Sequence, residues 1–264
     1  MRLARFSIPA GARVPTGTTN AYLLGRDPAI LVDPAGRTED LDRAVADCDV
    51  AHVVVTHTHH DHVGAVDAYA AETGATVWAR YGRTDRFREA TGRDPDRTFT
   101  PGTTITLGGD RVRVLEATGH APDHVAFEAG RGGPVCCGDC AIADGSVVVG
   151  APEGDMRAYL STLRRLHAID PPALHPGHGP TIDEPRETLE RLLTHRYRRE
   201  RRVLEAVDDG ARSIDEVLAA AYEKDLTGVR DLAAATIRAH VEKLAVEGNL
   251  QWDGERIESG DRRE

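Results

Sequence analysis

A dense group of side chains able to bind metal follows an apolar stretch early in the chain, in the segment THTHHDH at residues 56–62. Packing several imidazoles and a carboxylate together costs free energy unless they gain a partner, and a divalent metal ion is such a partner. In extended backbone, side chains two residues apart point the same way. His57 and His59 can therefore bind one ion from one side, while Asp61 and His62, beyond a turn, can reach a second position. The spacing predicts a metal site.

Three more polar residues stand beside glycine where an apolar segment ends. Glycine lets a loop approach an ion closely, and polar residues at strand ends are common in functional sites. Each of these segments alone is a weak signal. Their order after the first cluster makes them candidate ligands as a set, namely His120 in 118–120, Asp139 after Gly138, and His178 in 177–179.

Length and composition fit a soluble globular protein. The chain has 264 residues, of which 40% are hydrophobic and 29% charged, and no apolar run approaches the roughly 20 residues that span a bilayer. Residues 1–14 lack the apolar core and cleavage site of a signal peptide, so we expect a cytoplasmic protein with no membrane partner. Four clustered cysteines do not suit a secreted disulfide framework. The net charge of −10 argues against nonspecific nucleic-acid binding by the chain as a whole.

Strand-like and helix-like segments alternate as far as about residue 180, which favours an α/β layered domain. We expect strands at 20–24, 29–32, 51–56, 76–78, 103–107, 111–116, 124–128, 134–137, 146–149 and 173–175. We expect helices at 38–47, 63–73 and 155–168. Residues 80–101 differ, because six arginines lie there with little apolar periodicity. They form either a solvated face or a mobile wall over the metal site that attracts an anionic substrate.

After Pro180 the pattern is mostly helical. Three helical segments and a hairpin follow, at 184–208, from the capping box Ser213–Glu216 onward, at 230–247, and at 250–257. Helix, helix, helix and hairpin is a winged-helix pattern. We therefore expect a catalytic domain at 1–182, and a helical linker with a small winged-helix domain at 183–264.

These motifs resemble the metallo-β-lactamase fold superfamily of hydrolases, whose pattern is His-x-His-x-Asp-His followed by a His, an Asp and a final His. The resemblance covers residues from about 17 to 180. It implies an α/β fold, a four-layer αβ/βα sandwich. Within the superfamily, the segments 118–124 and 176–180 and the winged-helix pattern look like the branch of β-lactamase-like protein 2. Glyoxalase II is similar by the same motifs but more distant.

The resemblance also implies a ligand set for two divalent ions. His57, His59 and His120 hold one ion in this pattern. The second ion is held by Asp61, His62 and His178, and Asp139 bridges both. Such nitrogen and oxygen ligands suit zinc first, with iron or manganese as alternatives.

Two further residues are candidates for supporting roles near the ligands. Asp33 either orients a ligand histidine, as the resemblance suggests, or simply forms a turn before Pro34. His124 either positions the substrate or a neighbouring ligand, or is an ordinary strand residue.

The expected reaction is hydrolysis by a hydroxide that bridges two metal ions, since such ions activate water near neutral pH. Asp61 is the candidate catalytic residue, because its carboxylate can orient the nucleophile or accept a proton. True β-lactamases of the superfamily lack the bridging aspartate, so antibiotic hydrolysis is not expected from a chain with Asp139.

Three substrate classes stay open. A small thioester or ester follows from the glyoxalase II resemblance. Single-stranded RNA, cleaved by a metal-dependent endoribonuclease, follows from the β-lactamase-like protein 2 branch, and the basic segment 195–202 beside the winged helix favours it. A mononuclear iron dioxygenase of the same fold is the alternative of another class. The winged helix could bind nucleic acid, contact a second subunit in a homodimer, or only pack on the catalytic domain.

Overall fold

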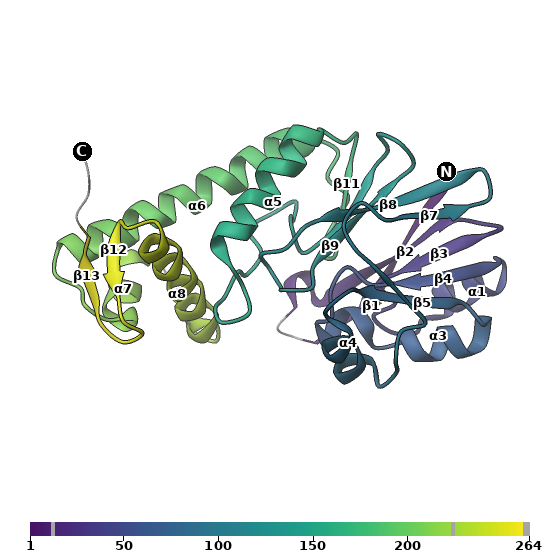
Figure 1. Ribbon diagram of the computed structural model, residues 1–264, viewed down its shortest axis with the longest axis horizontal. Helices are drawn as coiled ribbons and strands as arrows, with labels where there is room; N and C mark the ends of the chain where they lie inside the picture. Colours follow the sequence, from purple (N-terminus) through teal and green to yellow (C-terminus); the bar gives the residue numbers. More distant parts are fainter. Residues whose placement is uncertain (12–13, 223–224, 261–264) are drawn as a thin grey trace.

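Two β-sheets form the first part of the protein, a computed structural model of which describes residues 1–11, 14–222 and 225–260 (Figure 1). The first sheet contains β1 (Leu3–Pro9), β2 (Thr18–Gly25), β3 (Ala29–Val32), β4 (Val50–Val54), β5 (Thr76–Arg80) and β6 (Arg97–Phe99), in that spatial order. The pairs β1–β2 and β2–β3 are antiparallel, whereas β3 to β6 run parallel.

The second sheet is mostly antiparallel. It contains β7 (Thr104–Leu107), β8 (Asp110–Glu116), β9 (Val125–Ala129), β10 (Val135–Gly138) and β11 (Leu174–Pro176), in the spatial order β11-β10-β9-β8-β7. Only β10 and β11 pair in parallel. The parallel pair places the carboxyl ends of both strands at the same edge of the sheet.

Helices cover the outer faces of the two sheets. The first sheet carries α1 (Glu39–Ala46), α2 (His60–Val63), α3 (Val66–Thr73) and α4 (Thr84–Thr91), and a short 3-10 helix, η1 (Pro15–Gly17), precedes β2. The second sheet is covered by α5 (Met156–Ile169) and the first half of α6 (Pro185–Asp208). Helix, sheet, sheet and helix therefore form successive layers, as an α/β fold requires.

Alternation along the strands builds the layers. Leu23 and Leu31 pack in a core with α1 and α3, whereas their neighbours Tyr22 and Ile30 face the second sheet. All four side chains are at most 3% exposed, because both faces of these central strands are covered. Continuous apolar runs in the sequence thus mark the strands that lie between two layers.

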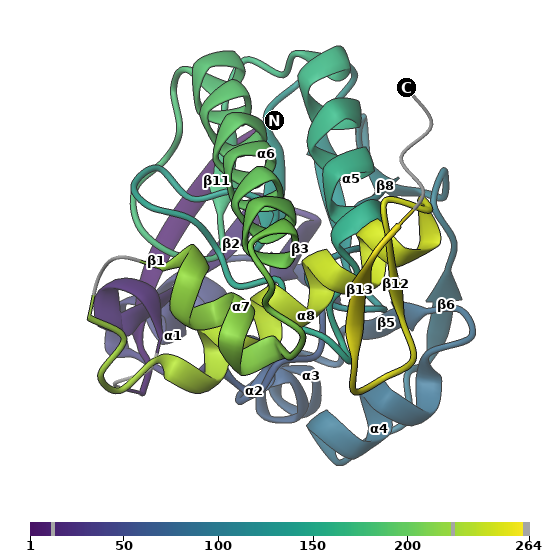
Figure 2. The ribbon, with the colours of Figure 1, turned by 90° about the vertical axis from the view of Figure 1, so that its left-hand side faces the viewer.

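The C-terminal part contains two more helices and a hairpin packed on the end of α6 (Figure 2). These elements are α7 (Ile214–Ala221), α8 (Arg230–Val246), β12 (Leu250–Trp252) and β13 (Ile257–Ser259). The expected capping box opens α7, since the Ser213 side chain accepts from the Glu216 backbone and the Glu216 side chain bonds back to Ser213. None of the described helices is long and apolar enough to cross a membrane.

One helix belongs to both parts of the protein. Leu189 and Leu192, in the first half of α6, are buried in the core under the second sheet. Val203 and Val207, in its second half, are buried with α7, α8 and the hairpin. The expected boundary near 182 therefore falls just before a continuous helix that connects the two cores.

The expected strand at 146–149 is wrong. Val147 and Val149 are buried and alternate with less buried neighbours, which is the pattern of a strand. The segment has no strand partner, however, because side chains take its carbonyl groups: Arg196 donates to Val147 O at 2.5 Å, and His120 donates to Val148 O at 2.7 Å. The segment therefore has the alternating side-chain burial of a strand but does not pair with another strand.

The arginine-rich stretch 80–101 contains α4 and β6. Arg88 is half-exposed and pairs with Asp85 and Asp94, as expected of a solvated face. Arg80 and Arg86 point inward instead. Arg80 forms a two-pronged ion pair with Glu116 at 3.0 and 2.8 Å. This segment therefore combines a solvated face with structural ion pairs.

Candidate metal centre

The candidate ligands come from loops at one edge of the two sheets. The segment that follows β4 carries His57 and His59 and leads into α2. His120 lies in the loop between β8 and β9, and Asp139 comes directly after β10. His178 follows β11. Strand ends that meet at the edge of a sheet thus bring residues up to about half the chain apart to one site.

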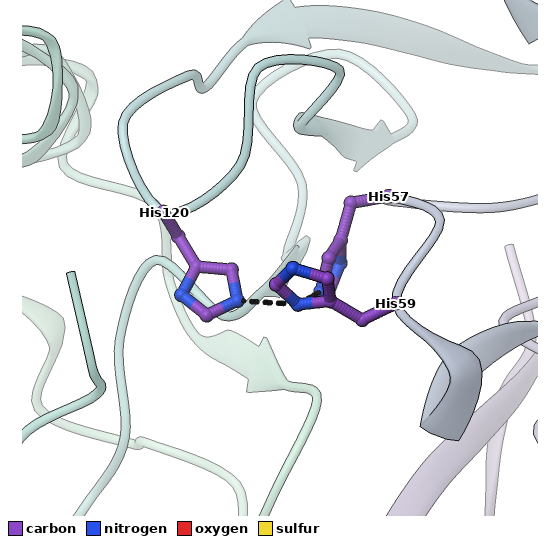
Figure 3. A group of neighbouring side chains, drawn as sticks. All are labelled: His57, His59 and His120. Carbon is purple, nitrogen blue, oxygen red and sulfur yellow. Dashed lines mark hydrogen bonds between the residues drawn. The ribbon is translucent and has the colours of Figure 1, made fainter. Parts of the chain in front are cut away.

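Three imidazoles converge on the position expected for the first ion (Figure 3). Nδ1 of His59 lies 3.0 Å from Nε2 of His57 and 3.0 Å from Nε2 of His120. Ligand atoms of one zinc ion lie roughly 3–3.5 Å apart when the bonds are about 2.0–2.1 Å long. The three nitrogens are therefore placed as ligands of a single ion.

A second group lies beside the first, where Asp61, His62 and His178 gather their donor atoms. Oδ2 of Asp61 is 3.4 Å from Nε2 of His178 and 3.9 Å from Nε2 of His62. The side chains of His62 and His178 are buried, while that of Asp61 is 27% exposed. Asp61 is thus the member of this group that solvent reaches most easily.

Asp139 lies between the two groups. Its Oδ2 is 3.5 Å from Nε2 of His120 and 3.3 Å from Nε2 of His178, and its Oδ1 is 3.6 Å from Nε2 of His62. Two of these buried atoms, His62 Nε2 and Asp139 Oδ1, have no hydrogen-bond partner. Buried polar atoms are costly to leave unpaired, so this arrangement suits a cation between them.

The outward-facing nitrogens determine where the lone pairs of four histidines point. Nδ1 of His120 contacts Val148 O at 2.7 Å, and Nδ1 of His178 contacts Thr18 O at 2.9 Å. A carbonyl oxygen only accepts, so each Nδ1 carries the proton and each Nε2 presents a lone pair to the centre. His62 is fixed in the same way by Asp33, at 3.1 Å. His57 uses the hydroxyl oxygen of Thr56, at 3.0 Å.

Asp33 combines the two roles that the sequence left open. Its backbone is left-handed, with φ of 49°, as in a tight turn before Pro34. Its side chain is buried and accepts from the Thr56 backbone N–H at 2.6 Å, from the Thr56 hydroxyl at 2.7 Å, and from His62. A single carboxylate thus ties the turn after β3 to the ligand-bearing segment after β4.

His124 contacts the backbone of a candidate ligand rather than the centre itself. The Asp139 backbone N–H donates to Nε2 of His124 at 3.0 Å. The His124 ring also stacks on the His57 ring, with centroids 4.7 Å apart and planes 25° apart. Burial lowers the pKa of His124 well below its usual range, which keeps Nε2 free to accept. His124 therefore positions Asp139 and His57 together.

Charges in the centre shift the pKa values of its members in opposite directions. Burial, followed by the neighbouring imidazoles, lowers the pKa of His57 well below its usual range. Burial also opposes protonation of His62, but the carboxylates of Asp139, Asp33 and Asp61 outweigh it and raise the pKa of His62 to about 9. Burial disfavours the anion of Asp139, yet hydrogen bonding to His178 and the nearby imidazoles hold its pKa well below the usual range.

Glycine is required where the loops approach the centre most closely. A methyl group on Gly177 would lie 2.4 Å from Oδ1 of Asp139 and 2.7 Å from Cε1 of His62. Gly138 has φ of +49°, and a methyl group there would lie 2.7 Å from Nε2 of His124. Gly177 thus leaves room for two candidate ligands, and Gly138 leaves room for His124, which supports Asp139.

Two residues at the centre were not identified from the sequence as site residues. Nε2 of His59 lies 3.0 Å from Oε2 of Glu153, and Nη1 of Arg86 lies 2.5 Å from Oε1 of the same carboxylate. Hydrogen bonding to Arg86 and to His59 lowers the pKa of Glu153 to about 2. Arg86 belonged to the arginine-rich stretch, but no local pattern distinguished it or Glu153.

Comparison with known proteins places this arrangement in a family. The model of the Metallo-beta-lactamase superfamily matches residues 14–178. The chain is 30% identical over 254 residues to the beta-lactamase-like protein 2 homolog of Drosophila melanogaster, covering 88% of this chain and 84% of the relative. It is 26% identical to an atrochrysone carboxyl ACP thioesterase of Aspergillus fumigatus, over 72% of this chain and 60% of the relative.

Solved structures agree. A metallo-beta-lactamase family protein from Thermus thermophilus superposes with a TM-score of 0.77 at 23% identity, covering 97% of this chain and 98% of that one. The protein TTHA1623, solved in a di-iron-bound form, gives a TM-score of 0.53 at 30% identity, over 69% of this chain and 96% of that one. The family match covers every candidate ligand from His57 to His178, and the chain is accordingly an enzyme of the metallo-beta-lactamase superfamily, whose members are generally hydrolases.

Proposed function

We propose that the protein is a dinuclear metal-dependent hydrolase in which seven side chains hold two divalent ions. One observation carries this proposal: Asp139 lies between two groups of imidazoles whose lone pairs face inward, and its Oδ1 and His62 Nε2 are buried without partners. Imidazole and carboxylate atoms that converge with two members unpaired suit cations placed between them. The relative in a di-iron-bound form supports a two-ion centre, while the donor set equally suits zinc, our first candidate.

The ligands divide between the ions as their contacts suggest. His57, His59 and His120 would hold the first ion. Asp61, His62 and His178 would hold the second, with Asp139 shared. When bound, two such ions supply an activated water near neutral pH and polarise the bond that water attacks.

Asp61 is the proposed catalytic residue. Its side chain is partly exposed, so one carboxylate oxygen can contact solvent or substrate while the other faces His178. A carboxylate so placed can orient the attacking water and accept a proton from it. The other carboxylate of the centre, Asp139, is buried among imidazoles and is better suited to holding the ions.

A small thioester or ester is the proposed substrate. The similarity to an enzyme named as a thioesterase supports this class. Val148, whose carbonyl accepts from the outward nitrogen of His120, also lines a cavity of about 250 Å³ with Val229 and Leu232, but none of the candidate ligands lines that cavity.

Single-stranded RNA is the second candidate substrate, and neighbouring side chains on α5 and α6 favour it. Tyr197 is 40% exposed, and the Arg164 guanidinium lies 5.8 Å from its ring centroid. Aromatic and arginine side chains of this kind stack on bases.

The alternative of a mononuclear iron dioxygenase uses one ion and would leave the second ligand group without a role. We also propose that α7, α8 and the β12–β13 hairpin form a winged helix. A cytoplasmic location and a homodimer stay predictions.

Competing substrates separate these proposals. The zinc-loaded chain would be assayed with an acyl thioester and, in parallel, with a short single-stranded RNA. We expect thioester hydrolysis that falls at least roughly 100-fold in Asp61→Asn. The control His167→Gln, on α5 where the side chain bonds to Glu190 of α6 and contacts no candidate ligand, should retain full activity. RNA cleavage abolished by the same change would favour the nuclease, and activity that survives Asp61→Asn would exclude this centre as its source.

A further inference from the structure

His59 differs from the other imidazoles of the centre in how its outward nitrogen is held. His120 and His178 bond to backbone carbonyls, and His62 bonds to the buried Asp33. His59 presents Nδ1 to the centre, so its outward nitrogen is Nε2, which donates to the Glu153 carboxylate at 3.0 Å. The Glu153 side chain is 47% exposed. The orientation of this one ligand therefore depends on a carboxylate at the surface.

Arg86 holds that carboxylate in place. Its Nη1 donates to Oε1 of Glu153 at 2.5 Å. Its Nε donates to the Thr58 hydroxyl at 2.8 Å and lies 3.2 Å from Oδ1 of Asp123. The Thr58 hydroxyl in turn donates to Oδ2 of the same aspartate at 2.7 Å.

The contacts of Arg86 connect three separate segments around His59. Thr58 is the residue directly before His59, Asp123 lies three residues after the ligand His120, and Glu153 precedes α5. Arg86 itself stands on α4. Asp123 is only 4% exposed, and the partly buried Arg86 guanidinium is the cation that pairs with its charge. Nε and Nη1 of the guanidinium both take part in these contacts.

We propose that Glu153 and Arg86 are positioning residues for the first metal ion: Glu153 fixes His59 with Nδ1 inward, and Arg86 fixes Glu153. This inference rests on the proposed metal centre. A carboxylate that accepts from a ligand histidine selects the tautomer and ring orientation needed for binding, and loss of such a partner weakens metal affinity by roughly 10–100-fold. A surface ion pair without this role contributes little to stability and nothing to metal affinity.

Zinc affinity of the metal-free full chain tests the proposal without any assay of catalysis. Zinc would be titrated in competition with a chromophoric chelator, and His59→Ala would identify the dissociation constant of the first site by removing it. We expect Glu153→Ala to raise that constant roughly 10–100-fold, while the second-site constant stays within about twofold of that of the unaltered chain. Glu153→Gln keeps an oxygen acceptor and should recover part of the loss.

Arg88→Ala is the matched control. Arg88 stands on the same helix as Arg86 and pairs with Asp85 and Asp94, but contacts no ligand. Its removal should leave both zinc constants unchanged. Arg86→Lys should weaken the first site in the unaltered chain but not when Glu153→Ala is already present, because Arg86 acts through Glu153. Thermal unfolding of Glu153→Ala should match the unaltered chain, since the side chain is half-exposed.

The possible outcomes are distinct. If the unaltered chain binds two zinc ions and Glu153→Ala weakens neither, the positioning role is wrong and the proposed centre stands. Equal weakening of both sites would also overturn it, because the change would then not be specific to His59. If the unaltered chain binds no zinc, the proposed function and this inference both fail.

Discussion

Asp33 Oδ2 accepts the Nδ1–H group of His62 at 3.1 Å, in a pocket where both side chains are at most 2% exposed. That contact turns Nε2 of His62 toward Asp139 and Asp61. The same carboxylate accepts two hydrogen bonds from Thr56, at the start of the segment that carries the first ligands. The residue just past the end of β3 thereby determines both the orientation of a ligand and the path of the backbone beside it.

Replacing Asp33 by Asn should weaken the second metal site. The amide retains one oxygen acceptor, but its NH2 group would face a hydrogen-bond donor that the second carboxylate oxygen now satisfies. The buried donor then has no acceptor, which should lower the free energy of unfolding by about 1–3 kcal/mol. Zinc affinity at the second site should fall roughly 10–100-fold. Chelator competition and urea unfolding measure the two effects. An Asp33→Asn chain with normal zinc affinity would show that Asp33 is only a turn residue.

The metal-free protein should lose stability as the pH rises from about 6.5, the ordinary pKa of histidine, to the pKa of about 9 that His62 has in the fold. Folding binds a proton at His62 in this range. The stabilisation is therefore complete below pH 6.5 and is lost as the pH rises through 9. Urea unfolding of the chelator-treated chain between pH 6 and 10 measures it.

His62→Gln is the control for this pH dependence. The glutamine side chain does not titrate, so the decline between pH 6.5 and 9 should be clearly smaller. A smaller decline should remain from His178, because hydrogen bonding to Asp139 outweighs burial and raises the pKa of His178 as well. Zinc-loaded protein should lack the decline altogether, because the metal replaces the protons of both histidines. If the metal-free His62→Gln chain loses as much stability over this range as the unaltered chain, the assignment to His62 is wrong.

Gly177→Ala should disrupt the centre without touching a ligand directly. The added methyl group would lie 2.4 Å from Oδ1 of Asp139 and 2.7 Å from His62, so one of the two must move. We expect loss of the second ion and destabilisation of about 1–3 kcal/mol, as for other overpacked sites. Gly109→Ala, where nothing lies within 4 Å of the added carbon, is the control. Equal metal content in the two variants would show that the centre tolerates a methyl group at position 177 beside Asp139 and His62.

The structure brings together the candidate ligands that the sequence predicted, because their spacing is local or they lie at strand ends. His57, His59, Asp61 and His62 stand within six consecutive residues, and the strand before them is a clear apolar run. The later ligands follow short strands beside glycine, and all four loops meet at one edge of the sheets. The alternation of strand-like and helix-like segments likewise predicted the layered α/β fold.

Features that depend on contacts between distant parts of the chain could not be predicted from the sequence. Glu153 and its partner His59 are 94 positions apart, and Glu153 stands in a turn with no periodic pattern. Arg86 was one of six arginines in its stretch, and only the packing of α4 distinguishes it from Arg88. The buried alternation at 146–149 predicted a strand, but whether such a segment pairs depends on what its carbonyl groups meet in the fold.

The number of metal ions per chain tests the central claim most directly. Elemental analysis would be made on the purified protein and on two variants, His59→Ala for the first ion and His178→Ala for the second. We predict two ions per chain in the unaltered protein and about one in each variant, because each change removes a ligand from only one group. One ion per chain in the unaltered protein, lost in His59→Ala and retained in His178→Ala, would contradict the two-ion centre.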